Sequence, residues 1–260
     1  MGTLRTAGIT VVAVLLFLGS QPAARAQNDA YMSTGSDQFG IIDLNTGVFT
    51  QLGNSGQLLS GLGAAGGNLY GGLDASNVLY QVNLTNGSLT EIGTGSINYA
   101  DTGSTTSGLY AVNVGQTDLY SVNPHTGATT LIGPTGFAGP FGLIGMSTGS
   151  STLYFTGDGN LYSLNTTTGA ATLIGTQGFD VGALVTEDGE LWAGANPLNE
   201  VFTLDPANAD PTFVANVSGD YGSFWGLAPL PLTTTPEPTT TSLLLLGLGA
   251  LVTFRRKLLS

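Results

Sequence analysis

Carboxylates are the side chains of this sequence with the widest chemical potential. Its 260 residues include 17 Asp and Glu but one His and no Cys. Two suitably spaced carboxyl groups are sufficient for glycoside hydrolysis, and carboxylate oxygens are preferred ligands of Ca²⁺. By contrast, one His and no Cys leave almost no side chains from which a His-based triad, a zinc site or a thiol nucleophile could be built. The chemistry therefore depends on which acids the fold brings together.

A repeated β pattern is expected to position these acids. Five stretches show strand, turn, strand, turn, strand, and they begin at Tyr31, Leu69, Leu109, Leu153 and Leu191. Their marker residues are Asp43, Asn83, Asn123, Asn165 and Asp205, with spacings of 40, 40, 42 and 40 residues. A period near 40 predicts β-propeller blades. A β-sandwich is the alternative, although it does not require five near-equal periods.

The marker residues predict the turns. A Gly follows four places later at Gly47, Gly87, Gly127 and Gly169. An Asx side chain can bond the turn backbone while Gly adopts the left-handed conformation that closes the hairpin. Ala209 stands in the fifth position, so we expect that hairpin to be looser or differently built.

A fourth, innermost strand is expected between repeats. Candidates lie around 60–63, 98–100, 141–144 and 181–184, and a last one at 224–228 follows the final repeat. Because the first repeat lacks an inner strand, pairing of the two chain ends would close the ring and remove exposed sheet edges. We therefore predict an all-β, five-bladed propeller of four-stranded blades, closed by its C-terminal strand.

Eight acids fall in the loops that this fold would place on one face. Five lie between the first and second strands of the repeats, counted without the inner strand: Asp37, Asp74, Asp118, Asp158 and Glu200. Three lie in the connections into inner strands: Asp101, Asp180 and Asp220. This face is a candidate surface for a ligand or for Ca²⁺. Since Asp is an ordinary turn residue and no EF-hand or nonapeptide calcium repeat is present, a purely structural role stays open, and we assign no metal site.

The three acids nearest the axis, Asp101, Asp180 and Asp220, are the candidates for a glycosidase pair. Such enzymes usually support their acids with basic neighbours, which are missing here, so we expect no enzyme and no catalytic residues. His125 lies in an Asn-Pro-His-Thr-Gly turn and is expected to be solvated. Five aromatic residues could stack on sugars, although core packing explains most of them better: Tyr99, Phe141, Phe179, Tyr221 and Trp225.

Charge excludes several classes of partner. The five basic residues are Arg5, Arg25, Arg255, Arg256 and Lys257, so the segment 27–235 contains none, against 16 acids. Nucleic-acid binding relies on cations that neutralise phosphates, and it is therefore not expected. Phosphorylated substrates and anionic lipid surfaces are disfavoured for the same reason.

The N-terminus resembles a signal peptide. Arg5 precedes the apolar run 9–18, and Ala24 and Ala26 have the small-x-small spacing of a cleavage site, which predicts Gln27 as the first mature residue. Ten apolar residues rise only about 15 Å as a helix, against a hydrocarbon core of about 30 Å. A membrane anchor is therefore the weaker alternative.

The C-terminus combines Pro236-Glu237-Pro238, the apolar run 243–254 and Arg255-Arg256-Lys257. This arrangement resembles the PEP-CTERM sorting signal of Gram-negative bacteria, and the repeats resemble those of bacterial extracellular propellers with an LY-x-V/I-N/D-x-x-TG pattern. The sorting resemblance implies recognition by exosortase, processing near the motif after transient inner-membrane anchoring, and delivery to the surface, biofilm or exopolysaccharide matrix. An ordinary single-pass anchor is the alternative.

Four segments follow from these patterns. We predict a signal peptide at 1–26, a propeller at 27–230, a Thr/Pro-rich linker at 231–242, and a hydrophobic helix with a basic tail at 243–260. The expected function is a non-enzymatic structural or interaction module, with signal peptidase and exosortase as processing partners. A glycosidase-like enzyme and a calcium-dependent lectin-like glycan binder are the alternatives.

Overall fold

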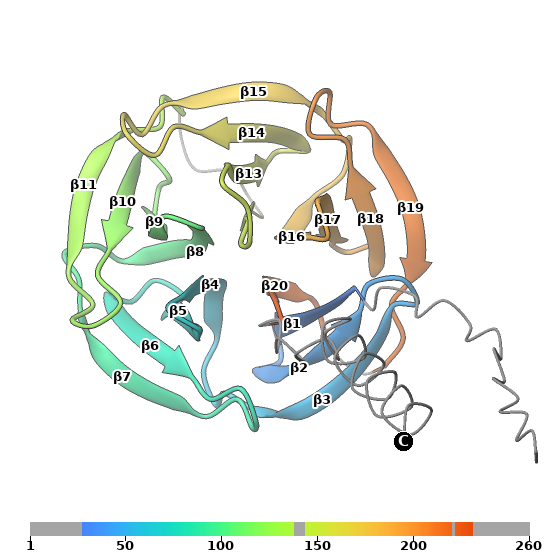
Figure 1. Cartoon of the computed structure of the whole chain (residues 1–260), viewed down its shortest axis with the longest axis horizontal. Helices are drawn as coiled ribbons and strands as arrows, with labels where there is room; N and C mark the ends of the chain where they lie inside the picture. The colour runs from blue at the N-terminus through green and yellow to red at the C-terminus, as the bar shows by residue number, and fades with distance from the viewer. Residues whose placement is uncertain (1–27, 138–143, 220–221, 231–260) are drawn as a thin grey trace, which may run out of the picture.

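The computed structural model describes residues 28–137, 144–219 and 222–230, and these form five antiparallel four-stranded sheets arranged as a ring (Figure 1). This confirms the predicted five-bladed propeller. The expected flanking helices at the two ends lie outside the described residues. Within the part that is described, no helix has the length and apolarity needed to span a bilayer.

Each blade runs from an inner strand to an outer strand. Blade 1 contains β20 (Phe224–Pro229), β1 (Asp29–Thr34), β2 (Gln38–Asp43) and β3 (Val48–Asn54). Blade 2 contains β4 (Leu59–Ala65), β5 (Asn68–Leu73), β6 (Val78–Val82) and β7 (Leu89–Thr94). Blade 3 contains β8 (Tyr99–Thr105), β9 (Gly108–Asn113), β10 (Asp118–Val122) and β11 (Thr129–Pro134).

The remaining blades follow the same order. Blade 4 contains β12 (Ile144–Met146), β13 (Leu153–Gly157), β14 (Asn160–Leu164) and β15 (Ala171–Thr176). Blade 5 contains β16 (Val181–Glu187), β17 (Glu190–Ala195), β18 (Glu200–Leu204) and β19 (Pro211–Asn216). The inner strand β12 is short, and residues 141–143 of its predicted span lie outside the described residues.

The last strand closes the ring as predicted. β20 pairs antiparallel with β1, from Ala30 opposite Pro229 to Thr34 opposite Phe224. The side-chain amide of Asn196 fixes this strand to blade 5: its Nδ2 donates to the Phe224 carbonyl (2.8 Å), and the Phe224 N–H donates to its Oδ1 (3.1 Å). The closing strand is therefore held on both sides.

The marker turns have the predicted geometry in every blade. The backbone N–H two residues after each marker donates to the Asx oxygen at 2.8–2.9 Å, at Asn45, Thr85, His125, Thr167 and Ala207. The expectation of a different fifth hairpin is wrong. Ala209 adopts φ +67° and donates to the Asp205 carbonyl (2.7 Å), as the glycines of the other blades do. Its fully buried methyl belongs to a core cluster with Leu204, which offsets the backbone strain.

Glycines permit the close contact between blades. A Cβ at Gly53, Gly133 or Gly175 would lie 2.0–2.2 Å from a carbonyl oxygen in the marker turn of the next blade. On the second strands, a Cβ at Gly72 would meet the Tyr99 ring at 2.3 Å, and one at Gly194 would meet the Phe224 ring at 2.3 Å. Each glycine thus leaves the space into which the neighbouring blade packs.

The core is divided among the blade interfaces. Each of five hydrophobic clusters joins residues of adjacent blades, as where Met32 of blade 1 packs with Trp192 and Val201 of blade 5. Across the centre, the Thr148 hydroxyl donates to the Leu62 carbonyl (2.6 Å). The inner strands are thereby fixed to one another as well as to their own blades.

Candidate functional site

Antiparallel strands divide the loops between two faces of the ring. We call one the connection face: it carries the loops between the second and third strands of each blade and the connections to the next inner strand. We call the other the hairpin face: it carries the turns between the first and second strands and between the third and fourth strands. The marker turns therefore lie on the hairpin face.

Six of the eight predicted acids lie at the connection face. They occupy the loops or the first strand residue after them: Asp37, Asp74, Asp118, Asp158, Asp180 and Glu200. Asp220 lies outside the described residues. In the described ranges, no three His, Cys, Asp or Glu side chains gather closely enough to hold a metal ion. The acids are therefore distributed around the face rather than brought into one cluster.

Asp101 departs from the sequence-based prediction. It lies inside β8 rather than in a connection, and it is only 2% exposed. The backbone N–H groups of Thr102 and Met146 donate to its carboxyl oxygens at 2.6 and 2.8 Å. Burial raises the pKa of Asp101 well above its usual value, although both hydrogen bonds act in the opposite direction. This carboxyl connects blade 3 to blade 4 and presents almost nothing to solvent.

The prediction missed the surroundings of Asp101 because they come from three blades. A Cβ at Gly61 of blade 2, where φ is +72°, would lie 1.8 Å from Asp101 Oδ1. Only glycine gives the carboxyl this space. The signal in the sequence is an acid within a run of inner-strand character, Tyr99 to Thr105, because this strand is buried at nearly every position.

A second group of acids lies on the hairpin face, and sequence reasoning singled out only one of them, Asp43, as a turn marker. Burial, then the charges of Asp188 and Asp29, raise the pKa of Glu187 to about 7. The pKa of Asp29 is itself raised by burial and by the charge of Asp43. Asp29 thus experiences repulsion both from Glu187 of blade 5 and from Asp43 of its own blade 1. The acidic stretch Glu187-Asp188-Gly189-Glu190 was the available signal.

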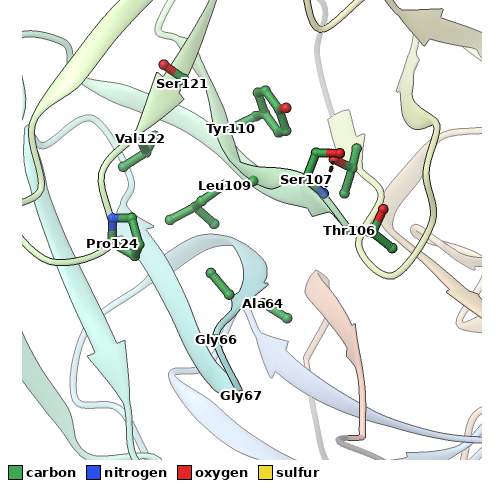
Figure 2. A pocket seen from close by; sticks show the side chains of 13 residues that line it. Ala64, Gly66, Gly67, Thr106, Ser107, Leu109, Tyr110, Ser121, Val122 and Pro124 are labelled. Carbon is green, nitrogen blue, oxygen red and sulfur yellow. Dashed lines mark hydrogen bonds between the residues drawn. The ribbon is translucent and has the colours of Figure 1, made fainter.

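A cavity of about 610 Å³ opens between the inner hairpins of blades 2 and 3 (Figure 2). It is bounded by Gly66-Gly67 at the β4–β5 tip, by Thr106-Ser107 at the β8–β9 tip, and by Pro124 in the marker turn of blade 3. A smaller apolar cavity of about 150 Å³ lies on the other side of Gly67, where Tyr31, Leu84 and Pro229 line it. Both belong to the hairpin face.

The other singled-out residues have structural surroundings. His125 is exposed in its marker turn, as expected. Tyr99 is fully buried. The ring of Phe179 packs on that of Phe202, with 4.5 Å between the two ring centroids. Trp225 donates from Nε1 to the Ser223 hydroxyl (3.0 Å). Phe141 and Tyr221 lie outside the described residues.

Both predicted processing sites also lie outside the described residues. They are the cleavage site at Ala24, Ala26 and Gln27 and the C-terminal motif. For the latter, a family model supplies the decisive finding, since residues 234–257 match the PEP-CTERM protein-sorting motif. The chain carries a PEP-CTERM sorting signal. The match contains Pro236, Glu237 and Pro238 together with Arg255, Arg256 and Lys257. A PEP-CTERM signal implies recognition by exosortase and export to the surface or the extracellular space.

Comparison with solved structures supports the fold alone. One similar structure is the symmetrical protein whose de novo evolutionary emergence is described as shaped by folding constraints, at 18% identity and TM-score 0.53, over 78% of this chain and 99% of that chain. Another is a chain of a nidogen/laminin complex, at 13% identity and TM-score 0.53, over 78% of this chain and 81% of that one. No curated protein matches in sequence.

Proposed function

We propose that this protein is a non-enzymatic structural or interaction module that exosortase delivers to the cell surface or the exopolysaccharide matrix. The observation that carries the proposal is the sorting motif at residues 234–257. The described propeller ends at Leu230, directly after the closing strand β20, and the motif begins four residues later. The propeller is therefore the cargo of this signal, and β20 stays with it when the chain is processed at the motif.

The surroundings of the acids support a non-enzymatic role. A glycosidase needs two carboxyl groups that reach the same bond of a bound substrate. Of the three candidates, Asp101 is 2% exposed and accepts hydrogen bonds from two backbone N–H groups. Its carboxyl serves to hold blades 3 and 4 together. The absence of Lys and Arg from 27–235 leaves the remaining acids without basic neighbours.

Calcium-dependent glycan binding is the competing proposal. A bound divalent cation would relieve the repulsion among these acids, which have no basic partners, and their carboxylates are ligands that Ca²⁺ prefers. Calcium binding would appear as a saturable rise of the melting temperature with CaCl₂ that MgCl₂ at equal ionic strength does not reproduce.

The proposal is tested by comparing the full gene product with a variant that lacks residues 234–257. We expect the complete chain in the surface or matrix fraction, and the truncated chain in a different fraction with its propeller intact. A hydrolysis screen on neutral and acidic glycans is run beside it, with Asp180→Asn as the matched variant. Glycan turnover that Asp180→Asn abolishes would replace the proposal with an enzyme.

A further inference from the structure

The cavity between blades 2 and 3 is bounded by a hairpin at which the sequence departs from its own repeat. The β4–β5 tip is Gly66-Gly67, with φ of +57° and +78°, and a Cβ at either position would meet no atom within 4 Å. The corresponding tips are Thr106-Ser107 in blade 3 and Asp188-Gly189 in blade 5. Blade 2 therefore lacks the side chains that would otherwise stand at this edge of the cavity, as Figure 2 shows.

The opposite wall is fixed in place. The Thr106 N–H donates to the Ser150 carbonyl of blade 4 (2.9 Å), and the Ser107 N–H donates to the Thr105 hydroxyl (3.1 Å). On the near side, the Ala64 N–H donates to the Ser104 hydroxyl (2.9 Å), which ties blade 2 to blade 3. The two walls are thus held at a defined separation before any ligand arrives, and this lowers the entropic cost of binding.

The lining is uncharged and carries both hydroxyl and apolar groups. None of the thirteen residues that line the cavity is ionisable at neutral pH. Thr106 and Ser107 are the exposed hydroxyl-bearing residues of the lining, while Pro124, with the buried Leu109 and Val122, supplies apolar surface. Tyr110 is only 8% exposed, and it packs with a core cluster of blade 4, so it offers no stacking platform.

We propose that this cavity is a binding site for a neutral glycan. An anionic sugar would meet no cation here, and desolvating its charge without a partner is costly. A neutral hexose matches the lining, because its C–H faces can cover Pro124 and the apolar floor while its hydroxyl groups bond Thr106, Ser107 and backbone groups. The volume of about 610 Å³ lies in the range of small-molecule sites.

The adjoining cavity extends the site. Ala64 and Gly67 line both cavities, so the side-chain-free tip separates the larger compartment, whose lining is mixed, from a smaller apolar one. An oligosaccharide that crosses the Gly66-Gly67 tip reaches both, whereas a monosaccharide fills only one. We therefore expect affinity to increase with chain length from one sugar unit to several.

The test uses the full chain in a polyoxyethylene detergent, which carries no sugar. Titration calorimetry measures binding of maltohexaose, cellohexaose, mannohexaose and chitohexaose, with polygalacturonate as the anionic probe. Saturable binding of at least one neutral hexaose, tighter than that of its monosaccharide, is expected. No heat from any of the four at millimolar concentration overturns the proposal, and so does equal or tighter binding of polygalacturonate.

Variants locate the site. Gly67→Asn adds a side chain that tolerates the left-handed conformation, and we expect it to weaken binding at least tenfold. Gly189→Asn is the matched control, because Gly189 has φ +83° and equally open surroundings at the tip of blade 5. Thr106→Ala and Ser107→Ala should each weaken binding by about two- to tenfold, as the net value of one hydrogen bond implies.

Equal effects of Gly67→Asn and Gly189→Asn, or full binding in the Thr106→Ala, Ser107→Ala double variant, would refute this site. The inference rests on the proposed interaction role, but its test is independent of sorting. A chain that reaches the surface yet binds no hexaose refutes the glycan site alone. A chain that hydrolyses the bound hexaose refutes the non-enzymatic role and leaves the site standing.

Discussion

Glu187 changes its charge close to neutral pH, because burial and the charges of Asp188 and Asp29 raise its pKa to about 7. In the unfolded chain its pKa returns to the ordinary glutamate value of about 4.5. The folded state therefore binds a proton that the unfolded state has lost between these two values. This contribution to stability is complete below pH 4.5 and disappears as the pH rises through about 7.

We predict that the melting temperature falls between pH 5 and pH 8, and that Glu187→Gln reduces this fall. Scanning calorimetry across the pH series measures it. Glu91→Gln, which removes one charge from an exposed position on β7, is the control and should leave the pH profile unchanged. An unaltered profile in Glu187→Gln would show that other groups cause the pH dependence.

Asn196 is the second residue with a specific expected effect. Its amide satisfies both the N–H and the carbonyl of Phe224 in a buried setting. Because each unsatisfied buried group costs about 1–3 kcal/mol, Asn196→Ala should lower the free energy of unfolding by about 2–5 kcal/mol. Urea denaturation measures the difference. Asn86→Ala, at an exposed turn position, should cost far less, and similar losses from both would contradict the assigned role.

At the scale of elements, β20 is the strand on which ring closure depends. It pairs with β1, and Phe224 packs on Gly194 of blade 5. A chain that stops at residue 219 would leave the edge of β1 unpaired, and exposed edges promote association between chains. We predict that this chain aggregates and loses cooperative unfolding, while a chain that stops at residue 230 keeps both solubility and a single transition. Sedimentation velocity and calorimetry distinguish these outcomes.

Some features of the blades can be predicted from the sequence, and others cannot. The turns at Asp43 and its counterparts and the inner strands follow from local spacing, because each repeat encodes the same hydrogen bonds. The closure by β20 follows from the inner strand that the first repeat lacks. Asp101 could not be placed, since its environment combines Gly61, Thr102 and Met146 from three blades. Backbone propensity alone predicts a looser turn at Ala209, whereas its buried methyl and its N–H hydrogen bond to the Asp205 carbonyl hold the turn.

For the candidate site, the sequence indicated six acids of the connection face but not the cavity of the hairpin face. The Gly66-Gly67 pair was visible, but its significance depends on what the Thr106-Ser107 tip of the next blade places opposite it. Glu187 was likewise visible as an acid, whereas its raised pKa depends on Asp29, which comes from the other end of the chain. Contacts between distant repeats are the part that spacing alone does not encode.

At the scale of the whole molecule, the ionisable side chains of the propeller are almost all acidic. The segment 27–235 has 16 acids and no Lys or Arg, so its charges repel one another over both faces. Salt screens this repulsion, with a Debye length of about 10 Å at 0.1 M. We predict that the melting temperature rises between 20 and 300 mM NaCl. The same scan in sucrose controls for solute effects without screening, and a flat or falling NaCl response would contradict the electrostatic account.

The sorting signal and the closed ring together define the molecule that reaches the surface, and the intact mass of the exported protein tests this most directly. The account predicts a species that begins at Gln27, retains β20 through Pro229, and ends before Arg255. An exported chain that still contains Arg255, Arg256 and Lys257, or one that ends before Phe224, would contradict it.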